Sequence, residues 1–274
     1  MPESPEVQIL TEVLDDRLVS HAIVAVELEE FRALKTRGRP LDELIGSTVT
    51  AVRRFGKHVD IETTGAHLVI SFGRAGWALL TSPGEEPQTD AAVLARIRFD
   101  DDSVLTVTDA GSFLSLGLSV ADAASDVPAI AKLGPDPTDP TYTSKQFDAV
   151  LVGRRKQLRA LLQEQESIAG IGGAYSDEIL YAAGLSPLVH AAELTAPERE
   201  RLFTAMRQVL TEATSARRGI PLPDQKAAKV AAMNVHGRAG EPCPDGDGTV
   251  LDVPGSKGGA QYCPGRQTGG VPLA

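Results

Sequence analysis

The 274-residue sequence contains little cysteine and few aromatic residues, with two cysteines, one tryptophan and 4% aromatic residues in all. Two cysteines are too few for a disulfide scaffold, and the N-terminal segment lacks the basic start and continuous apolar run of a secretory signal. No apolar run approaches the roughly 20 residues that a membrane-spanning helix needs. We therefore expect a cytoplasmic protein with reduced cysteines and no membrane association.

A surplus of positive charge is also missing, because 27 Lys and Arg stand against 37 Asp and Glu and the formal net charge is −10. This balance excludes a cationic coat over the whole surface, and 42% apolar residues exclude general disorder. Residues 215–274 differ, since they hold seven basic and five acidic residues and carry +2, against −12 for residues 1–214. Any surface that binds a polyanion must therefore be local.

The first half of the sequence predicts a helix followed by an antiparallel β-sandwich or barrel. Apolar residues recur at helical spacing over 5–20. Short β-type runs follow, and Asp100–Ser103 separates two of them at hairpin distance. The expected strands are 48–53, 59–63, 67–72, 93–99 and 104–108.

The second half predicts helices and a small tail. Four prolines between 118 and 144 indicate a connecting loop, and residues 144–216 have helical patterns interrupted by the glycine-rich segment 169–174. From Gly219 onward helical periodicity disappears, which is typical of a β-hairpin or loop module. We expect an α+β multidomain chain: a β-sandwich domain at 1–120, a linker at 121–143, a helical domain at 144–218 and a tail at 219–274.

The N-terminal residues offer a possible nucleophile. A small second residue permits removal of Met1, after which Pro2 has a free secondary amine that can attack an aldehyde-like carbon and form an iminium. The neighbouring Glu3 can act as general acid and base if burial raises its pKa. Taken alone, a Pro-Glu start is more often a simple exposed chain end.

Two further segments are suited to contact phosphate. Gly56 predicts a turn that presents Lys57, and the glycines of 169–174 let backbone amides approach an anion at the start of a helix. A basic helix precedes the glycines and carries the cluster Arg154, Arg155, Lys156 and Arg159. Each of these features also has an ordinary structural explanation when it is taken alone. Lys57 can be a surface residue of a turn, the basic cluster can be the solvated face of a helix, and the glycines can form a tight turn between helices.

Taken together and in this order, the segments resemble the formamidopyrimidine-DNA glycosylase and endonuclease VIII family of DNA repair enzymes over nearly the whole chain. The resemblance covers the Pro-Glu-x-Pro-Glu start, the basic turn and a helix-two-turn-helix element. It rests on these segments: 2–6, 56–58, 133–137, 169–178 and 236–244.

The resemblance implies a bifunctional glycosylase and lyase that extrudes a damaged base from duplex DNA. Pro2 would attack C1′ and form a Schiff base, Glu3 would protonate the sugar ring oxygen, and Lys57 would bind the backbone beside the lesion. No cofactor or catalytic metal is implied. The expected partner is double-stranded DNA with a damaged base or an abasic site. We expect a monomer that is associated with the nucleoid of a bacterial cell. The residues expected to bind DNA are Lys57, Arg74, Phe113, Arg155, Gly170, Gly172, Gly173 and Lys257.

The tail departs from the family, in which two Cys-x-x-Cys pairs commonly form a zinc finger. Cys243 and Cys263 are only the first cysteine of each pair, and two ligands do not make a structural zinc site. A mixed site would have to recruit Asp245, Asp247 or His236; a zincless hairpin finger is the expectation we prefer. The position of the family's finger arginine is Gly258, so Lys257 is the substitute that we expect to contact phosphate.

Three other departures fall where the family contacts DNA. Arg74 stands where a methionine fills the space of the extruded base, and Gly111 stands where an arginine pairs with the unpaired partner base. Phe113 is kept and can insert between bases, whereas Gly173 replaces an asparagine that holds phosphate. Arg74 is a candidate for part of the missing arginine's role.

These departures leave alternative functions open. An active enzyme with unusual lesion or opposite-base preference is one, and a DNA-binding relative with little or no base excision is the second. Proline chemistry on a small carbonyl substrate is a third, against which the basic cluster and the glycine turn argue. Each enzymatic alternative requires the removal of Met1.

Overall fold

The computed structural model describes residues 1–256 and 259–274, and its backbone packing divides the chain into two compact units. Unit 1 consists of Met1–Lys132 and Arg217–Lys226, and unit 2 of Leu133–Ala216 and Ala227–Ala274. The division into two domains, a linker and a tail stays a prediction.

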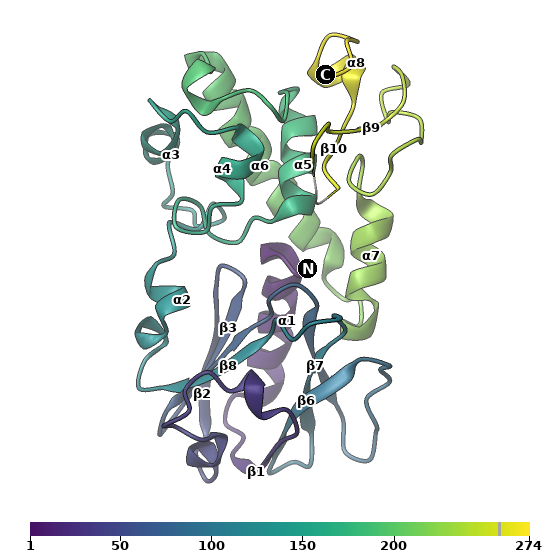
Figure 1. Ribbon diagram of the computed structural model, residues 1–274. Helices are drawn as coiled ribbons and strands as arrows, with labels where there is room; N and C mark the ends of the chain where they lie inside the picture. Colours follow the sequence, from purple (N-terminus) through teal and green to yellow (C-terminus); the bar gives the residue numbers. More distant parts are fainter. Residues whose placement is uncertain (257–258) are drawn as a thin grey trace. The chain divides into compact units, whose positions relative to one another are not determined.

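Unit 1 is an α+β unit in which one helix precedes two sheets (Figure 1). Short 3-10 helices, η1 (Phe31–Ala33), η2 (Leu41–Leu44), η3 (Ala124–Asp126) and η5 (Leu222–Asp224), lie in its connections. Its helices and strands are α1 (Ser4–Leu18), β1 (Ile23–Leu28), β2 (Val49–Phe55), β3 (His58–Thr63), β4 (His67–Ser71), β5 (Gly76–Thr81), β6 (Ala92–Phe99), β7 (Val104–Asp109), β8 (Gly117–Ala121) and α2 (Pro128–Ala131).

Within the described residues, the strands form two antiparallel four-stranded sheets with the orders β1-β6-β7-β5 and β2-β3-β4-β8. A continuous apolar core joins both sheets and α1, so the expected antiparallel β-sandwich is confirmed. The hairpin at Asp100–Ser103 is also present, with Phe99 N–H donating to the Ser103 carbonyl at 3.0 Å. The sequence patterns missed β1, β5 and β8. Strand β8 was missed because it is buried throughout and does not alternate.

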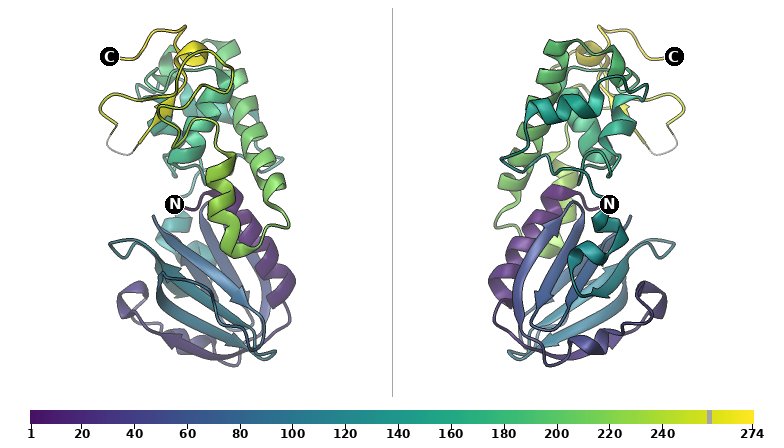
Figure 2. Two further views of the ribbon diagram at one scale, coloured as in Figure 1. Left: turned by 90° about the vertical axis from the view of Figure 1, so that its right-hand side faces the viewer. Right: turned by 90° about the vertical axis from the view of Figure 1, so that its left-hand side faces the viewer.

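Helix α1 lies along one edge of the sandwich, beside β2 (Figure 2). Its apolar stripe, Val7, Leu10, Leu14 and Leu18, is fully buried in the core of unit 1, which confirms the helix predicted for this segment. The Asp15 carboxylate accepts from the Val52 N–H at 2.8 Å and so satisfies a donor of the edge strand β2.

Unit 2 is mainly helical. A separate apolar core joins α3 to α6. Together with η4 (Ala191–Glu193), the remaining elements of the chain are α3 (Ser144–Leu151), α4 (Leu158–Leu162), α5 (Gly173–Ala183), α6 (Ala196–Arg217), α7 (Gln225–Ala232), β9 (Leu251–Asp252), β10 (Gln261–Tyr262) and α8 (Pro264–Gln267).

Two helix predictions for this half are wrong. The basic cluster at 154–156 lies in a loop and not on a helix, because Gly153 has φ +76° after the end of α3 and the loop backbone pairs with 189–192. The tail was expected to lack helices, yet α7 forms from the alanine-rich sequence QKAAKVAA. Only two turns long, this helix has too few residues for a clear periodic pattern.

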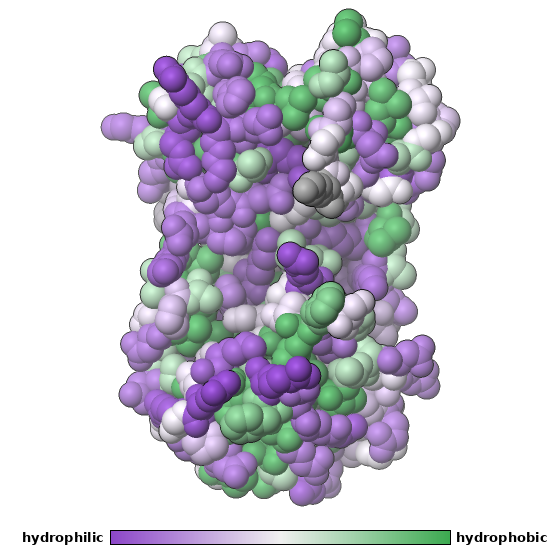
Figure 3. Space-filling model, viewed as in Figure 1, coloured by the Kyte–Doolittle hydropathy of each residue, from purple (hydrophilic) through white to green (hydrophobic). Residues whose placement is uncertain are grey.

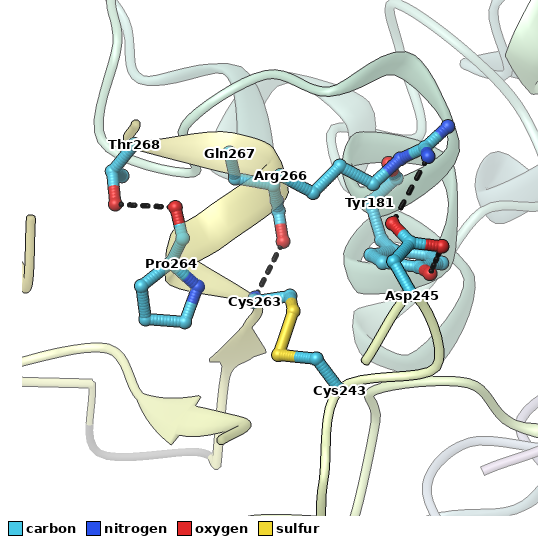
Figure 4. The surroundings of a disulfide bond; sticks show 8 residues. All are labelled: Tyr181, Cys243, Asp245, Cys263, Pro264, Arg266, Gln267 and Thr268. Carbon is cyan, nitrogen blue, oxygen red and sulfur yellow. Dashed lines mark hydrogen bonds and ion pairs between the residues drawn. A yellow bond between two sulfur atoms is a disulfide. The ribbon is translucent and has the colours of Figure 1, made fainter. Parts of the chain in front are cut away.

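The tail contains a β9–β10 hairpin of two residues per strand and a disulfide between Cys243 and Cys263 (Figure 4). The expectation of two reduced cysteines is therefore wrong in this structure. The Cα atoms lie 5.9 Å apart although 20 positions separate the residues in sequence, and this proximity arises from the tertiary fold of the tail.

The surface shows no dominant apolar face in the view drawn. On that face hydrophilic residues predominate and hydrophobic residues form small patches (Figure 3). Among the described residues, none of the helices has the length and apolar character required to cross a membrane.

Candidate functional site

The start of α1 holds the proposed nucleophile and acid in unit 1. Pro2 is partly exposed, and Glu3 directly precedes the helix with its side chain 1% exposed. Glu6 Oε2 accepts from the Glu3 N–H at 3.0 Å, and Glu6 Oε1 lies 3.1 Å from Arg217 Nε. Both partners of this ion pair are almost completely buried. The ion pair therefore fixes the backbone on which Pro2 and Glu3 stand.

The β2–β3 turn presents Lys57 at the same end of unit 1. Gly56 has φ +56°, so the turn predicted here is present, and it consists of the two residues between β2 and β3. Arg54 donates to the Gln8 side chain at 2.8 Å and to the Gly56 carbonyl at 3.0 Å. Since Asp15 contacts Val52 and Gln8 contacts Arg54, β2 runs toward the N-terminal end of α1, and the turn lies at that end.

Strand pairing brings two more turns to this end of unit 1. His58 pairs with Ser71 in the β3–β4 ladder, with His58 Nδ1 2.7 Å from Ser71 Oγ, so the β4–β5 turn at 72–75 lies beside the Lys57 turn. Gly76 pairs with Asp109, which places the β7–β8 loop next to the β4–β5 turn. Burial and the nearby Lys57 ammonium lower the pKa of His58 to about 4, so this imidazole is neutral near pH 7.

Asp109 holds the β7–β8 loop in one conformation. Its carboxylate accepts from the backbone N–H groups of Gly111, Ser115 and Leu116 at 2.8 to 3.1 Å and from the Ser115 hydroxyl at 3.1 Å. Burial acts to raise the pKa of Asp109, but these hydrogen bonds outweigh burial and hold the pKa below its ordinary value. The loop is thus anchored at both ends by one ionised side chain.

The anchored loop exposes an aromatic side chain at its tip. Phe113 is 87% exposed, and Arg74 is exposed on the adjacent β4–β5 turn, where its N–H donates to Ser115 Oγ at 2.9 Å. Gly73 has φ +57°, and a Cβ there would lie 2.3 Å from the Ser115 carbonyl oxygen, so the two segments are in direct contact. An exposed phenylalanine on a loop whose backbone is anchored is suited to stack on a flat apolar surface such as a base.

In unit 2, the glycine-rich turn leads directly into α5. Gly170 has φ +90°, Gly172 is the N-cap residue and Gly173 begins the helix, so the turn leads its backbone into a helix N-terminus, where the helix dipole favours an anion. A Cβ on Gly173 would lie 3.4 Å from Arg159 Nη2. The guanidinium of Arg159 therefore lies where a larger side chain at 173 would extend, held by Asp177 at 2.6 Å.

Of the two basic residues of unit 2 that were predicted to bind DNA, Arg155 is described and Lys257 is not. A hollow of about 440 Å³ is lined by Lys156 and Arg159 and by tail residues 253–256. Arg155 is exposed in the loop between α3 and α4. Lys257 and Gly258, on which the expected finger contact depends, lie outside the described residues.

Two buried carboxylates that no sequence pattern indicated hold the tail to α5. Glu178 accepts four hydrogen bonds at 2.8 to 2.9 Å, from the backbone N–H groups of residues 234–236 and from the Asn234 amide. The fully buried Asp177 contacts Arg159 and, at 2.7 Å, His236. The adjacent acidic residues were visible in the sequence, but their partners in the tail lie more than 50 positions away.

The tail residues do not fit a zinc site. The sulfur atoms of Cys243 and Cys263 are bonded to each other and cannot serve as thiolate ligands. Asp245 accepts from the Tyr181 hydroxyl at 2.9 Å and pairs with Arg266 (Figure 4), and His236 contacts Asp177. Among the described residues, the cluster with metal-ligand spacing is the partly exposed set His21, Asp100 and Asp101, far from these cysteines in sequence.

One end of unit 1 thus gathers four chemically distinct groups. Pro2 supplies a secondary amine once residue 1 is removed, Glu3 a buried carboxyl, Lys57 an ammonium and Phe113 an exposed ring. An amine with an adjacent acid can form an iminium with an aldehyde-like carbon. The structure therefore brings together the sequence-predicted residues of unit 1, and separately those of the glycine turn of unit 2.

The sequence matches two protein-family models. Residues 1–116 match the formamidopyrimidine-DNA glycosylase N-terminal domain, and residues 133–221 match the formamidopyrimidine-DNA glycosylase H2TH domain. A formamidopyrimidine-DNA glycosylase of Salinispora arenicola is 34% identical over 257 residues, which cover 89% of this chain and 88% of the relative. One of Heliobacterium modesticaldum is 32% identical over 273 residues, with coverage of 96% and 99%.

Solved structures show the same fold. A complex of wild-type Lactococcus lactis Fpg with DNA containing N7-benzyl-Fapy-dG superposes with a TM-score of 0.85 at 24% identity, covering 97% of this chain and 100% of the other. A complex of a mutant of the Lactococcus protein with THF-containing DNA has a TM-score of 0.86 with the same identity and coverage.

Proposed function

Because the chain belongs to the formamidopyrimidine-DNA glycosylase family, we propose that it removes damaged bases from double-stranded DNA and then cleaves the strand as an AP lyase. The observation that carries this proposal is the placement of Pro2 and the buried Glu3 at the end of unit 1 that also presents Lys57 and the exposed Phe113. A nucleophile, an acid, a phosphate ligand and a base-stacking ring are the groups that such a reaction needs.

The proposed reaction begins at the Pro2 nitrogen. Its lone pair attacks C1′ of the extruded nucleotide as the glycosidic C1′–N bond breaks and the base leaves with a proton. Glu3 donates a proton to the ring oxygen as the C1′–O4′ bond opens, which yields the iminium. Loss of a C2′ proton then expels the 3′ phosphate, and a second elimination expels the 5′ phosphate. The iminium acts as the electron sink, so these steps use only organic groups of the protein.

The remaining basic and glycine residues are proposed to hold the DNA backbone. Lys57 binds the phosphate next to the lesion, as expected for an ammonium group on a short turn. The amides at Gly172 and Gly173 bind a flanking phosphate at the N-terminus of α5, assisted by Arg159 in place of the absent asparagine. Gly170 shapes this turn, and Arg155 adds an exposed positive charge. We propose that the protein acts as a monomer.

A covalent trapping experiment tests the proposed reaction. The purified protein is incubated with a duplex containing an abasic site and with sodium borohydride, which reduces an iminium to a stable amine. We expect a covalent adduct that peptide mass spectrometry locates at the Pro2 nitrogen, and an intact mass that lacks Met1. An adduct at Lys57, or a retained Met1 in protein that still cleaves, contradicts the assigned nucleophile.

The principal alternative is a DNA-binding protein that excises no base. The glycines at 111, 173 and 258 and the net charge of −10 favour it, since each weakens contact with DNA. Tight binding to the abasic duplex without any adduct, and without excision from a panel of duplexes with different damaged bases, would establish this alternative. The small-carbonyl hypothesis predicts that added duplex DNA does not inhibit the reaction.

A further inference from the structure

Arg54 joins the turn that carries Lys57 to helix α1 within unit 1. Arg54 Nε donates to Gln8 Oε1 on α1 at 2.8 Å, and Arg54 Nη1 donates to the Gly56 carbonyl at 3.0 Å. One planar guanidinium therefore holds an acceptor on a helix and an acceptor in a turn that is remote from it in sequence. We term this contact the Arg54 bridge (Gln8, Arg54 and Gly56).

The hydrogen bond to Gly56 fixes the backbone of Lys57. The Gly56 carbonyl belongs to the peptide group that continues into the nitrogen and Cα of Lys57, and a peptide group is planar. Gly56 has φ +56°, so the shape of the turn depends on glycine. The hydrogen bond from Arg54 then sets the orientation of the peptide plane. The Cα atom from which the Lys57 side chain extends is thereby held in place.

The hydrogen bond to Gln8 ties the turn to the helix that begins at the proposed nucleophile. Gln8 lies five residues after Glu3, which corresponds to about 7 Å along a helix. Its amide has a defined orientation, because Nε2 donates to Glu12 Oε1 at 3.2 Å while Oε1 accepts from Arg54. Glu12 in turn accepts from the Arg218 guanidinium at 2.9 and 3.0 Å. The acceptor that Arg54 uses is therefore held in place by its neighbours.

We propose that Arg54 is a positioning residue, which places the Lys57 ammonium relative to the start of α1. The proposal rests on the proposed function, because it concerns the residue that binds phosphate beside the lesion. Arg54 acts through Lys57 and does not contact DNA itself. A phosphate held by Lys57 fixes the nucleotide to which it belongs, and a displacement of about 1 Å from the reactive geometry can slow a reaction about a hundredfold.

Strand β2 does not depend on the Arg54 bridge for its own position. Val52 N–H donates to Asp15 on α1 at 2.8 Å, and the β2–β3 ladder continues to the pair of Phe55 with His58. Removal of the Arg54 side chain therefore leaves the strand on α1 and affects the turn. A loss of function in such a variant reports on the turn and not on unfolding of the sheet.

The test measures binding to a duplex with a tetrahydrofuran abasic analogue at several salt concentrations. Each lost phosphate contact lowers the slope of log K against log salt by about 0.9, whereas a loss of folding stability alone does not change this slope. Lys57→Met should weaken binding about tenfold, the effect of one hydrogen bond to a charged group. Arg54→Met should reproduce most of this loss and most of the change in slope.

The double variant separates a positioning role from a direct one. If Arg54 acts through Lys57, Arg54→Met adds almost nothing in protein that already carries Lys57→Met. Arg54→Lys keeps the charge but presents a single nitrogen, so it should recover part of the affinity. Additive losses with a slope lowered by about 1.8 overturn the proposal, because Arg54 then contacts DNA itself. Wild-type binding by Arg54→Met overturns it as well.

A neutral change at the other end of the bridge avoids any effect of lost charge. Gln8→Leu removes the acceptor on α1, and should weaken binding less than Arg54→Met because the hydrogen bond to Gly56 remains. This loss too should vanish in the Lys57→Met background. Unchanged binding by Gln8→Leu overturns the proposal, and this variant gives a decision even if Arg54→Met does not fold.

The matched charge control is the adjacent Arg53. This side chain is exposed and pairs with Glu62 across the β2–β3 ladder, so it takes no part in the Arg54 bridge. Arg53→Met should leave the affinity, the salt slope and strand cleavage close to those of the wild type. An effect equal to that of Arg54→Met overturns the proposal, because general loss of positive charge then explains both.

Borohydride trapping on an abasic duplex distinguishes failure of this proposal from failure of the proposed function. No adduct with the wild-type protein rejects the reaction itself. An adduct in the wild type, together with a Lys57→Met variant that binds as tightly as the wild type, leaves the reaction standing. That result rejects Lys57 as the phosphate ligand and, with it, the positioning role of Arg54.

Discussion

The end of unit 1 that carries Pro2 and the tail of unit 2 are both held by buried carboxylates, but the cores beneath them differ in size. The carboxylates are Glu6 and Asp109 in the first region and Asp177 and Glu178 in the second. In unit 1 these anchors rest on a core that joins both sheets and α1. The tail region has a small cluster with the disulfide inside it, Tyr181, Val235, Cys243, Val250 and Cys263.

The comparison shows that a region with a small apolar core can be stabilised by a disulfide and by buried hydrogen bonds. A segment that buries little apolar surface gains little from the hydrophobic effect, so covalent and polar contacts have to contribute the rest. We therefore expect single changes in the tail to act locally, and changes at the buried ion pair of unit 1 to destabilise the whole unit.

The largest effect is expected at the buried ion pair between Glu6 and Arg217. Arg217→Met leaves the Glu6 carboxylate buried without its partner, which should lower the free energy of unfolding by about 3 to 5 kcal/mol. Urea denaturation measures this change. The double variant Glu6→Gln with Arg217→Met removes both charges and should recover much of the loss. If the double variant is no more stable than Arg217→Met, the unpaired Glu6 charge is not the cause of the lost stability.

The disulfide should come next, with an effect confined to the tail. Closing a loop of this length contributes about 3 kcal/mol in the chain-entropy model. A thiol reductant should therefore speed hydrogen exchange in residues 240–265 and leave the exchange of the unit 1 sheets unchanged. The double variant Cys243→Ala with Cys263→Ala should not respond to the reductant. Equal loss of protection in both units would contradict the local role.

Replacing Glu178 should have a somewhat smaller effect on the same region. Glu178→Gln keeps the shape but removes the charge and one of the two acceptor oxygens, so part of the four hydrogen bonds from residues 234–236 is lost. We expect a local destabilisation of about 2 kcal/mol, measured as faster exchange of the amides of 235 and 236. Unchanged protection of these amides would mean that the tail is held by other contacts.

The smallest effect concerns His58 in unit 1. Its pKa is about 4 in the folded protein because of burial, below the ordinary value of 6.5. Between these values the unfolded chain binds a proton that the folded one does not, so stability falls as the pH is lowered from about 6.5 to 4. Partial exposure limits the contribution to on the order of 1 kcal/mol. His58→Asn should flatten the measured pH dependence by this amount, and an unaltered slope would exclude His58 as a source.

Features with a strong local cause could be predicted from the sequence. The apolar stripe of α1, the hairpin at Asp100–Ser103 and the two-residue turn at Gly56 depend on residues within a few positions of one another. The edge strand β1, the fully buried β8 and the short α7 have weak local patterns and were missed.

The order of the chemical groups, from the Pro-Glu start to the glycine turn, and the family of the chain follow from the amino-acid sequence alone. The folded chain is needed to show that Arg217 pairs with Glu6, that Cys243 bonds to Cys263, and that Arg74 and Phe113 project from contacting loops. The physical reason is distance along the chain: hydrogen bonds, ion pairs and a disulfide between segments that are remote in sequence arise from close packing, which no local pattern of residues encodes.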